Sequence, residues 1–170
     1  MSITAAIRIQ LKNAVEHVLH VQGNYTGGIL EMAIVIDRNL PKEEAAQRAK
    51  DLVQILKSQN EIFRNVRLNI ILWGDEPEFI KQVTALPLLQ TGSFFESYNS
   101  CESEKQWDNL LALLKKFYAR SKLILVLSDK EFTTENKTEA KAHLQPFLHK
   151  KLIVLSQTQV KTGTQLWREL

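Results

Sequence analysis

The segment GILEMAIVIDRNLPKE, residues 28–43, decides the fold class of this chain. Its first half is a run of apolar residues, many of which favour β-structure, and the run stops at Asp37. A strand that is buried on both faces of a sheet reads as such a run. Pro41 follows almost at once, and proline suits the first turn of a helix. The segment therefore predicts a buried strand followed directly by a helix, as in an α/β fold.

The same pattern of a strand followed by an acidic residue occurs twice more. It recurs in LNIILWGDE, residues 68–76, and in KLILVLSDKE, residues 122–131. Open α/β sheets place their binding sites outside the carboxyl ends of the strands. We therefore expect Asp37, Asp75 and Asp129 to lie along one edge of a common sheet.

The remaining elements follow from hydrophobic periodicity. Apolar residues at helical spacing predict helices over residues 2–20, 41–62, 107–118, 138–148 and 162–170. Residues 78–86 alternate after a turn and predict an antiparallel edge strand beside residues 66–73, and residues 152–155 predict a further strand. The predicted fold is one α/β domain over residues 1–170, a doubly wound, mostly parallel sheet with one antiparallel edge strand and helices on both faces. Residues 1–22 are expected to form an N-terminal helical extension.

The composition narrows the classes of function. A chain of 170 residues with 44% hydrophobic residues is long enough for one domain with a substantial core. The net charge of +3 comes from 22 basic and 19 acidic residues that are spread along the chain, so no nucleic-acid partner is expected. The single cysteine, Cys101, excludes an internal disulfide and suits a reducing compartment. No apolar run is long enough for a membrane span or a signal peptide, so we expect a cytoplasmic protein without membrane partners.

Three segments, in this order, resemble the von Willebrand factor A-like (vWA-like) domain over residues 28 to about 158. AIVIDRNL looks like the first strand of that family with its D-x-S-x-S motif. RLNIILWGDEPEFIKQVTAL looks like its second strand and antiparallel third strand, and LILVLSDKE looks like the later strand that ends in T-D-G. The resemblance implies a Rossmann-like sheet and a protein–protein interaction module.

The family resemblance also implies a metal ion adhesion site. In the family, aspartates, serines and a threonine from separate loops hold a divalent cation, which needs several oxygen ligands. The corresponding residues of this chain are Asp37, Asn39, Ser103 and Asp129. Pro41 occupies the second serine position and offers no donor oxygen, and Lys130 adds a positive charge beside Asp129. We therefore expect a degenerate site without metal, with Mg²⁺ bound by the four residues as the alternative.

Two classes of function follow from these observations. The first is a metal-independent protein-binding module that uses the carboxyl edge of the sheet and the loop at residues 91–104, with Phe94, Phe95 and Tyr98 as anchors. Packing of these aromatics within their own domain is the alternative for the loop. The second class is a Mg²⁺-dependent nuclease or phosphatase that uses Asp37, Asp75 and Asp129 as ligands. No glycine-rich phosphate loop or nucleophile elbow supports an enzyme.

Overall fold

The computed structural model describes residues 4–20, 29–57, 65–85, 87, 94–148 and 151–170. Residues 23–28, whose sequence GNYTGG predicts a loop, lie outside these ranges. Within these ranges the strands are β1 (Leu30–Asp37), β2 (Val66–Trp73), β3 (Pro77–Val83), β4 (Leu123–Leu127), β5 (Leu152–Leu155) and β6 (Val160–Thr162). The helices are α1 (Ala5–His20), α2 (Lys42–Lys57), α3 (Asp108–Tyr118), α4 (Lys137–Leu144) and α5 (Gly163–Glu169), with a 3₁₀ turn at Gln145–Phe147. No described helix is both long enough and apolar enough to cross a membrane.

The strands form one mixed sheet in the order β3-β2-β1-β4-β5-β6. The four central strands are parallel, and β3 pairs with β2 in the antiparallel sense. This confirms an α/β fold with a mostly parallel sheet and an antiparallel edge strand close to residues 78–86. The prediction of a single antiparallel edge strand is wrong, because β6 pairs antiparallel with β5 at the other edge. With three residues, β6 is too short to show a strand period.

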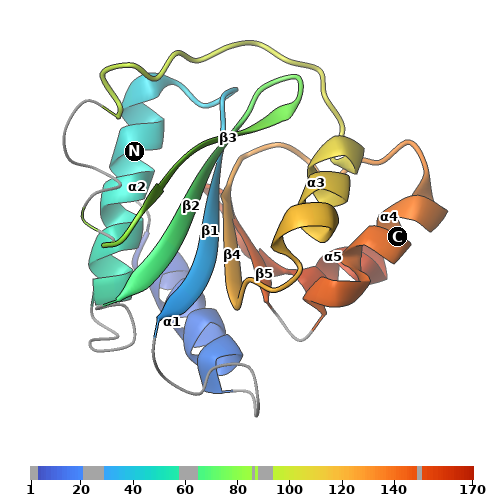
Figure 1. The fold of residues 1–170 in the computed structure, drawn as a ribbon, viewed down its shortest axis with the longest axis horizontal. Helices are drawn as coiled ribbons and strands as arrows, with labels where there is room; N and C mark the ends of the chain where they lie inside the picture. The colour runs from blue at the N-terminus through green and yellow to red at the C-terminus, as the bar shows by residue number, and fades with distance from the viewer. Residues whose placement is uncertain (1–3, 21–28, 58–64, 86, 88–93, 149–150) are drawn as a thin grey trace.

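Helices cover both faces of the sheet (Figure 1). Alternate residues of each strand point to opposite faces, so the core has two parts. Met32, Ile34 and Ile36 of β1 pack with α1 and α2, whereas Ala33 and Val35 pack with α3, α4 and α5. Because β1 lies at the centre of both parts, its apolar run is buried almost without interruption.

The N-terminal helix and α2 both present apolar stripes to the sheet. In α1, Ile7, Leu11 and Val15 are buried in the same core as β1, so this helix packs on the sheet of its own chain. In α2 the buried stripe is Ala45, Ala49, Leu52, Val53 and Leu56. The predicted continuation of α2 to residue 62 falls outside the described residues.

The strand register brings the predicted site residues to one edge. Asp37 at the end of β1 lies beside Trp73 at the end of β2, and Ile36 lies beside Leu127 at the end of β4. The segments that follow these strands therefore start next to one another. The sheet places the chain around Asp37, Asp75 and Ser128 at its carboxyl edge.

Candidate functional site: a buried charge pair at the carboxyl edge

Asp37 is a buried carboxylate at the end of β1, with only 1% of its surface exposed. Its Oδ1 atom accepts hydrogen bonds from Lys105 Nζ at 2.5 Å and from the backbone N–H of Asn39 at 2.9 Å. Its Oδ2 atom accepts a hydrogen bond from the hydroxyl of Ser128 at 2.6 Å. Hydrogen bonds to an ionised acceptor are short and strong. Asp37 is thus held by donors from three separate segments of the chain.

Lys105 supplies the positive charge of this site. Its side chain is 3% exposed, and Nζ lies 2.5 Å from Asn39 Oδ1 as well as from Asp37 Oδ1. The same ammonium lies 4.6 Å from the centre of the Trp73 ring, which adds a cation–π contact. A buried charge is tolerated when it is paired and hydrogen-bonded. The carboxylate, the amide oxygen and the indole ring together meet this requirement.

A second set of hydrogen bonds joins the site to the chain before α3. Asn39 Nδ2 donates to the carbonyl of Ser103 at 2.9 Å, and the hydroxyl of Ser103 donates to Asp75 Oδ1 at 2.8 Å. The backbone N–H of Lys105 lies 3.3 Å from the same hydroxyl oxygen and donates to it. The structure therefore brings Asp37, Asn39 and Ser103 together; their role as metal ligands stays a prediction.

Asp129 lies nearby but has a different partner. It lines the same hollow of about 320 Å³ as Asp37 and Asn39, yet both of its oxygens accept hydrogen bonds from the Arg48 guanidinium, at 2.8 and 2.6 Å. The backbone N–H of Gln157 donates to Asp129 Oδ1 at 2.8 Å. Arg48 itself is buried within α2. Asp129 therefore fixes α2 to the end of β4 and does not contact Lys105.

The pKa of Asp129 is lowered by these contacts. Burial raises the pKa of this carboxyl group, but the hydrogen bonds from Arg48 and Gln157 and the charge of Arg48 together lower it below its ordinary value. A carboxyl group whose pKa is lower in the folded chain stabilises the fold above its unfolded pKa of about 3.9. That contribution is lost as the pH falls through the folded pKa.

We expect Asp129→Asn to destabilise the protein at neutral pH and to lose this effect in acid. The difference in unfolding free energy between wild type and Asp129→Asn should be constant above about pH 5 and should shrink below about pH 4. Urea denaturation across this range measures it, and Glu139→Gln on the exposed face of α4 is the control. A difference that persists unchanged in acid would contradict the assigned pKa direction.

The aromatic residues of the loop lie mostly in the core. Phe94 and Tyr98 are buried, and Phe95 is partly exposed and packs against the same core as α2. The Tyr98 hydroxyl lies 2.8 Å from the carbonyl of Leu40 and 3.2 Å from that of Asp37. Burial, and to a lesser extent the charge of Asp37, raises the pKa of Tyr98 well above its ordinary value. These contacts favour the alternative that the aromatics hold the loop; a role as partner anchors stays a prediction.

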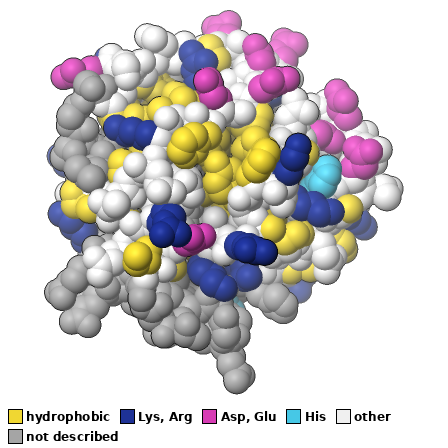
Figure 2. Space-filling view, in the orientation of Figure 1, with side chains coloured by type: hydrophobic (Ala, Val, Ile, Leu, Met, Phe, Trp, Pro, Cys, Tyr) yellow, Lys and Arg dark blue, Asp and Glu magenta, His cyan; other side chains and the backbone are white. Residues whose placement is uncertain are grey.

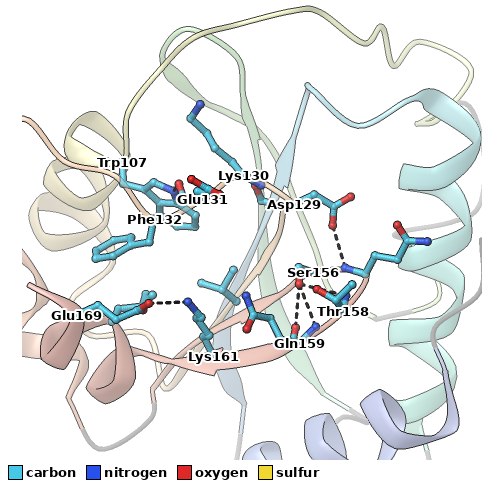
Figure 3. A pocket seen from close by; sticks show the side chains of 14 residues that line it. Trp107, Asp129, Lys130, Glu131, Phe132, Ser156, Thr158, Gln159, Lys161 and Glu169 are labelled. Carbon is cyan, nitrogen blue, oxygen red and sulfur yellow. Dashed lines mark hydrogen bonds and ion pairs between the residues drawn. The ribbon is translucent and has the colours of Figure 1, made fainter.

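A pocket of about 640 Å³ lies beside Asp129 (Figure 3). Trp107 and Phe132 line one side of it, and Ser156, Thr158 and Gln159 of the turn before β6 line the other. Lys161 and Glu169 also line it and form an ion pair at 2.6 Å. With Lys130 and Glu131 at its rim, the pocket carries charges of both signs and no strong preference for either.

A second, more apolar groove of about 430 Å³ lies between β3 and α3. Phe79 of β3 and Phe117 of α3 line this groove and are 48% and 63% exposed. Arg67 and Arg120 also line it, together with Glu31, to which Arg67 is paired. Figure 2 shows hydrophobic side chains gathered over this part of the molecule, with basic and acidic side chains around them.

Sequence reasoning missed the two cations that complete the buried pairs, Lys105 and Arg48. Arg48 had a detectable signal, because it lies three residues after Ala45 on the apolar stripe of α2. Lys105 lies in an irregular segment without periodicity, so no pattern in the sequence indicates that it is buried.

Comparison with known proteins adds no family to these observations. A scan against protein-family models and a search of curated proteins each found no match to this chain.

Proposed function

We propose that this chain is a protein-interaction module of vWA-like type that binds its partner without a metal ion. The proposal has three parts, which are the type of fold, the independence from metal, and the surface that contacts the partner. The observation that carries it is the pair of exposed phenylalanines, Phe79 and Phe117, in the groove between β3 and α3.

The arrangement of strands supports the vWA-like, doubly wound assignment. The order β3-β2-β1-β4-β5-β6 is the order of doubly wound sheets of the Rossmann type. In such sheets the binding crevice lies at the carboxyl ends of the strands where the strand order reverses. Here that position lies between the carboxyl ends of β1 and β4, and Asp37 ends β1 beside it.

Metal independence is supported by the charge that Lys105 brings to Asp37. The resemblance places a divalent cation against this carboxylate, but the ammonium lies 2.5 Å from both Asp37 Oδ1 and Asn39 Oδ1. A divalent cation of Mg²⁺ type needs about six oxygen ligands at close range. The residues present therefore do not fit a bound cation while Lys105 is in place.

The groove between β3 and α3 has the chemistry of a protein-binding surface. Large aromatic side chains are the commonest anchors of interfaces, and they are normally buried in an isolated domain. Phe79 is about half exposed, and Phe117 is more exposed still. Two arginines and one acidic residue line the groove with them. This composition favours a partner segment that carries an apolar anchor and acidic flanking residues.

The groove lies at the opposite end of β1 from Asp37. Glu31 and Arg67, near the starts of β1 and β2, line it, whereas Asp37 ends β1. The proposed surface therefore differs from the carboxyl-edge surface expected from the sequence, where Phe94 and Tyr98 are buried.

The three acids of the enzyme alternative are each engaged by the protein itself. Asp37 binds Lys105, Asp75 accepts from Ser103, and Asp129 binds Arg48. Within the described residues, no group of three or more His, Cys, Asp or Glu side chains is arranged to hold a metal ion. No observation favours phosphoryl chemistry over protein binding.

Affinity capture with matched variants tests the proposal. Wild type, Phe117→Glu and the control Ile9→Glu, which alters an exposed residue of α1, are immobilised and offered a cell extract in excess Mg²⁺ or in EDTA. We expect the same protein to be captured by wild type and Ile9→Glu in both buffers. Phe117→Glu should reduce capture of this protein by tenfold or more, because loss of an aromatic anchor commonly costs about 2 kcal/mol of binding free energy. Capture that needs Mg²⁺, or that Phe117→Glu leaves unchanged, would overturn the proposal.

A further inference from the structure

The oxygen atoms of this site come from segments that only the fold brings together, and two of them, Asp37 Oδ1 and Asn39 Oδ1, contact the Lys105 ammonium directly. Asp37 and Asn39 follow β1, Ser103 precedes α3, and Ser128 follows β4. The hydroxyl of Ser103 links this group to Asp75 after β2. Carboxylate, amide, hydroxyl and carbonyl oxygens converging from several loops are the ligands of hard cations such as Mg²⁺ and Ca²⁺.

The cation that the Asp37 and Asn39 oxygens hold is part of the chain. The Lys105 ammonium is in hydrogen-bonding contact with Asp37 and Asn39 and is almost fully buried. Its single charge balances the single charge of Asp37, while Ser128 satisfies the other carboxylate oxygen. The site is therefore neutral and hydrogen-bonded without any ion from solution.

We propose that the Lys105 ammonium is the resident cation of this site, and that a divalent cation binds to the same oxygens once the side chain is shortened. Removal of the ammonium leaves Asp37 with an uncompensated buried charge and opens the space beside Asn39. Both changes favour entry of a hard cation with its remaining water ligands. The inference deepens the metal-independent part of the proposed function and does not depend on the partner or on the groove at Phe117.

Metal titration of Lys105 variants tests this inference without any partner protein. Mn²⁺ is the probe, because its electron paramagnetic resonance signal reports free and bound ion directly. The chains compared are wild type, Lys105→Ala, Lys105→Ser, Lys105→Ala with Asp37→Asn, and the control Lys130→Ala. Lys130 is a lysine of the neighbouring loop, and within the described residues its side chain forms no hydrogen bond or ion pair with Asp37.

Lys105→Ala should bind one Mn²⁺ per chain and gain about 5 °C or more in melting temperature at saturating Mn²⁺. Wild type and Lys130→Ala should show neither effect, and the added Asp37→Asn change should abolish both. Lys105→Ser supplies an additional hydroxyl oxygen and provides a second variant if Lys105→Ala does not fold in the absence of the ion. Each binding result is independent of whether Phe117→Glu affects capture of a partner.

Four outcomes would overturn the inference. They are a melting temperature of the wild type that rises with Mn²⁺, the absence of Mn²⁺ binding in folded Lys105→Ala, binding that survives Asp37→Asn, and failure of both shortened variants to fold in Mn²⁺.

Discussion

Replacing Lys105 by methionine is expected to lower the free energy of unfolding by about 3 to 5 kcal/mol. Methionine keeps the length and most of the apolar contacts of the lysine stem but removes its charge. Asp37, 1% exposed, would then retain a buried negative charge without its cation. Breaking a buried ion pair by removing one partner is strongly destabilising for this reason. Urea denaturation measures the change, provided that both the midpoint and the dependence of the unfolding free energy on urea concentration are determined.

The paired variant Lys105→Met with Asp37→Asn is the control for this result. It removes both charges, so the penalty for an unpaired carboxylate disappears and a substantial part of the lost stability should return. The double-mutant cycle isolates the coupling between the two side chains. A loss below about 1 kcal/mol in Lys105→Met, or a double variant no more stable than Lys105→Met, would show that the pair is not coupled as the geometry indicates.

Trp107→Ala is expected to lower the free energy of unfolding by about 3 to 5 kcal/mol. Trp107 is buried at the start of α3, and its ring makes edge contacts with Trp73 at 4.7 Å and with Phe132 at 5.5 Å between centroids. Its indole N–H donates to the carbonyl of Glu131 at 2.9 Å. Alanine would leave a large cavity beneath the site and an unpaired carbonyl.

Phe117→Ala is the matched control for Trp107→Ala. It removes an aromatic ring from the other end of α3, where the ring is 63% exposed, so its effect should stay within about 0.5 kcal/mol. Urea denaturation of both variants gives the comparison. Equal losses in the two variants would show that Trp107 does not pack as described.

Much of the fold could be predicted from the sequence, because buried parallel strands leave an unmistakable apolar run. The runs that end at Asp37, Trp73 and Leu127 became β1, β2 and β4. Parallel strands share a carboxyl edge, so Asp37 and Asp75, which end or follow β1 and β2, could be predicted to lie along one edge of the sheet. Asn39 and Ser103 were indicated only by the vWA-like resemblance. The vWA-like resemblance rests on the same order of elements and stays a prediction.

The parts that could not be predicted depend on packing between distant segments. Lys105 resembles any surface lysine in the sequence, and only the close approach of Asp37, Asn39 and Trp73 makes its burial favourable. Phe94 and Tyr98 resemble exposed loop aromatics, because nothing local shows that α2 and the end of β1 lie beside them. These residues acquire their roles from tertiary contacts and not from local periodicity.

The separation in sequence between the members of the charge pair has a consequence for the kinetics of folding. Lys105 lies 68 residues after Asp37, and Ser128 lies 91 residues after it. Contacts at such separation require closure of long loops, which slows folding. The sheet can begin to form while the Asp37 carboxylate is still hydrated. Burial of this carboxylate becomes favourable only once Lys105 is paired with it. We therefore expect the pair to form after the folding transition state, so that Lys105→Met accelerates unfolding and leaves the rate of folding nearly unchanged.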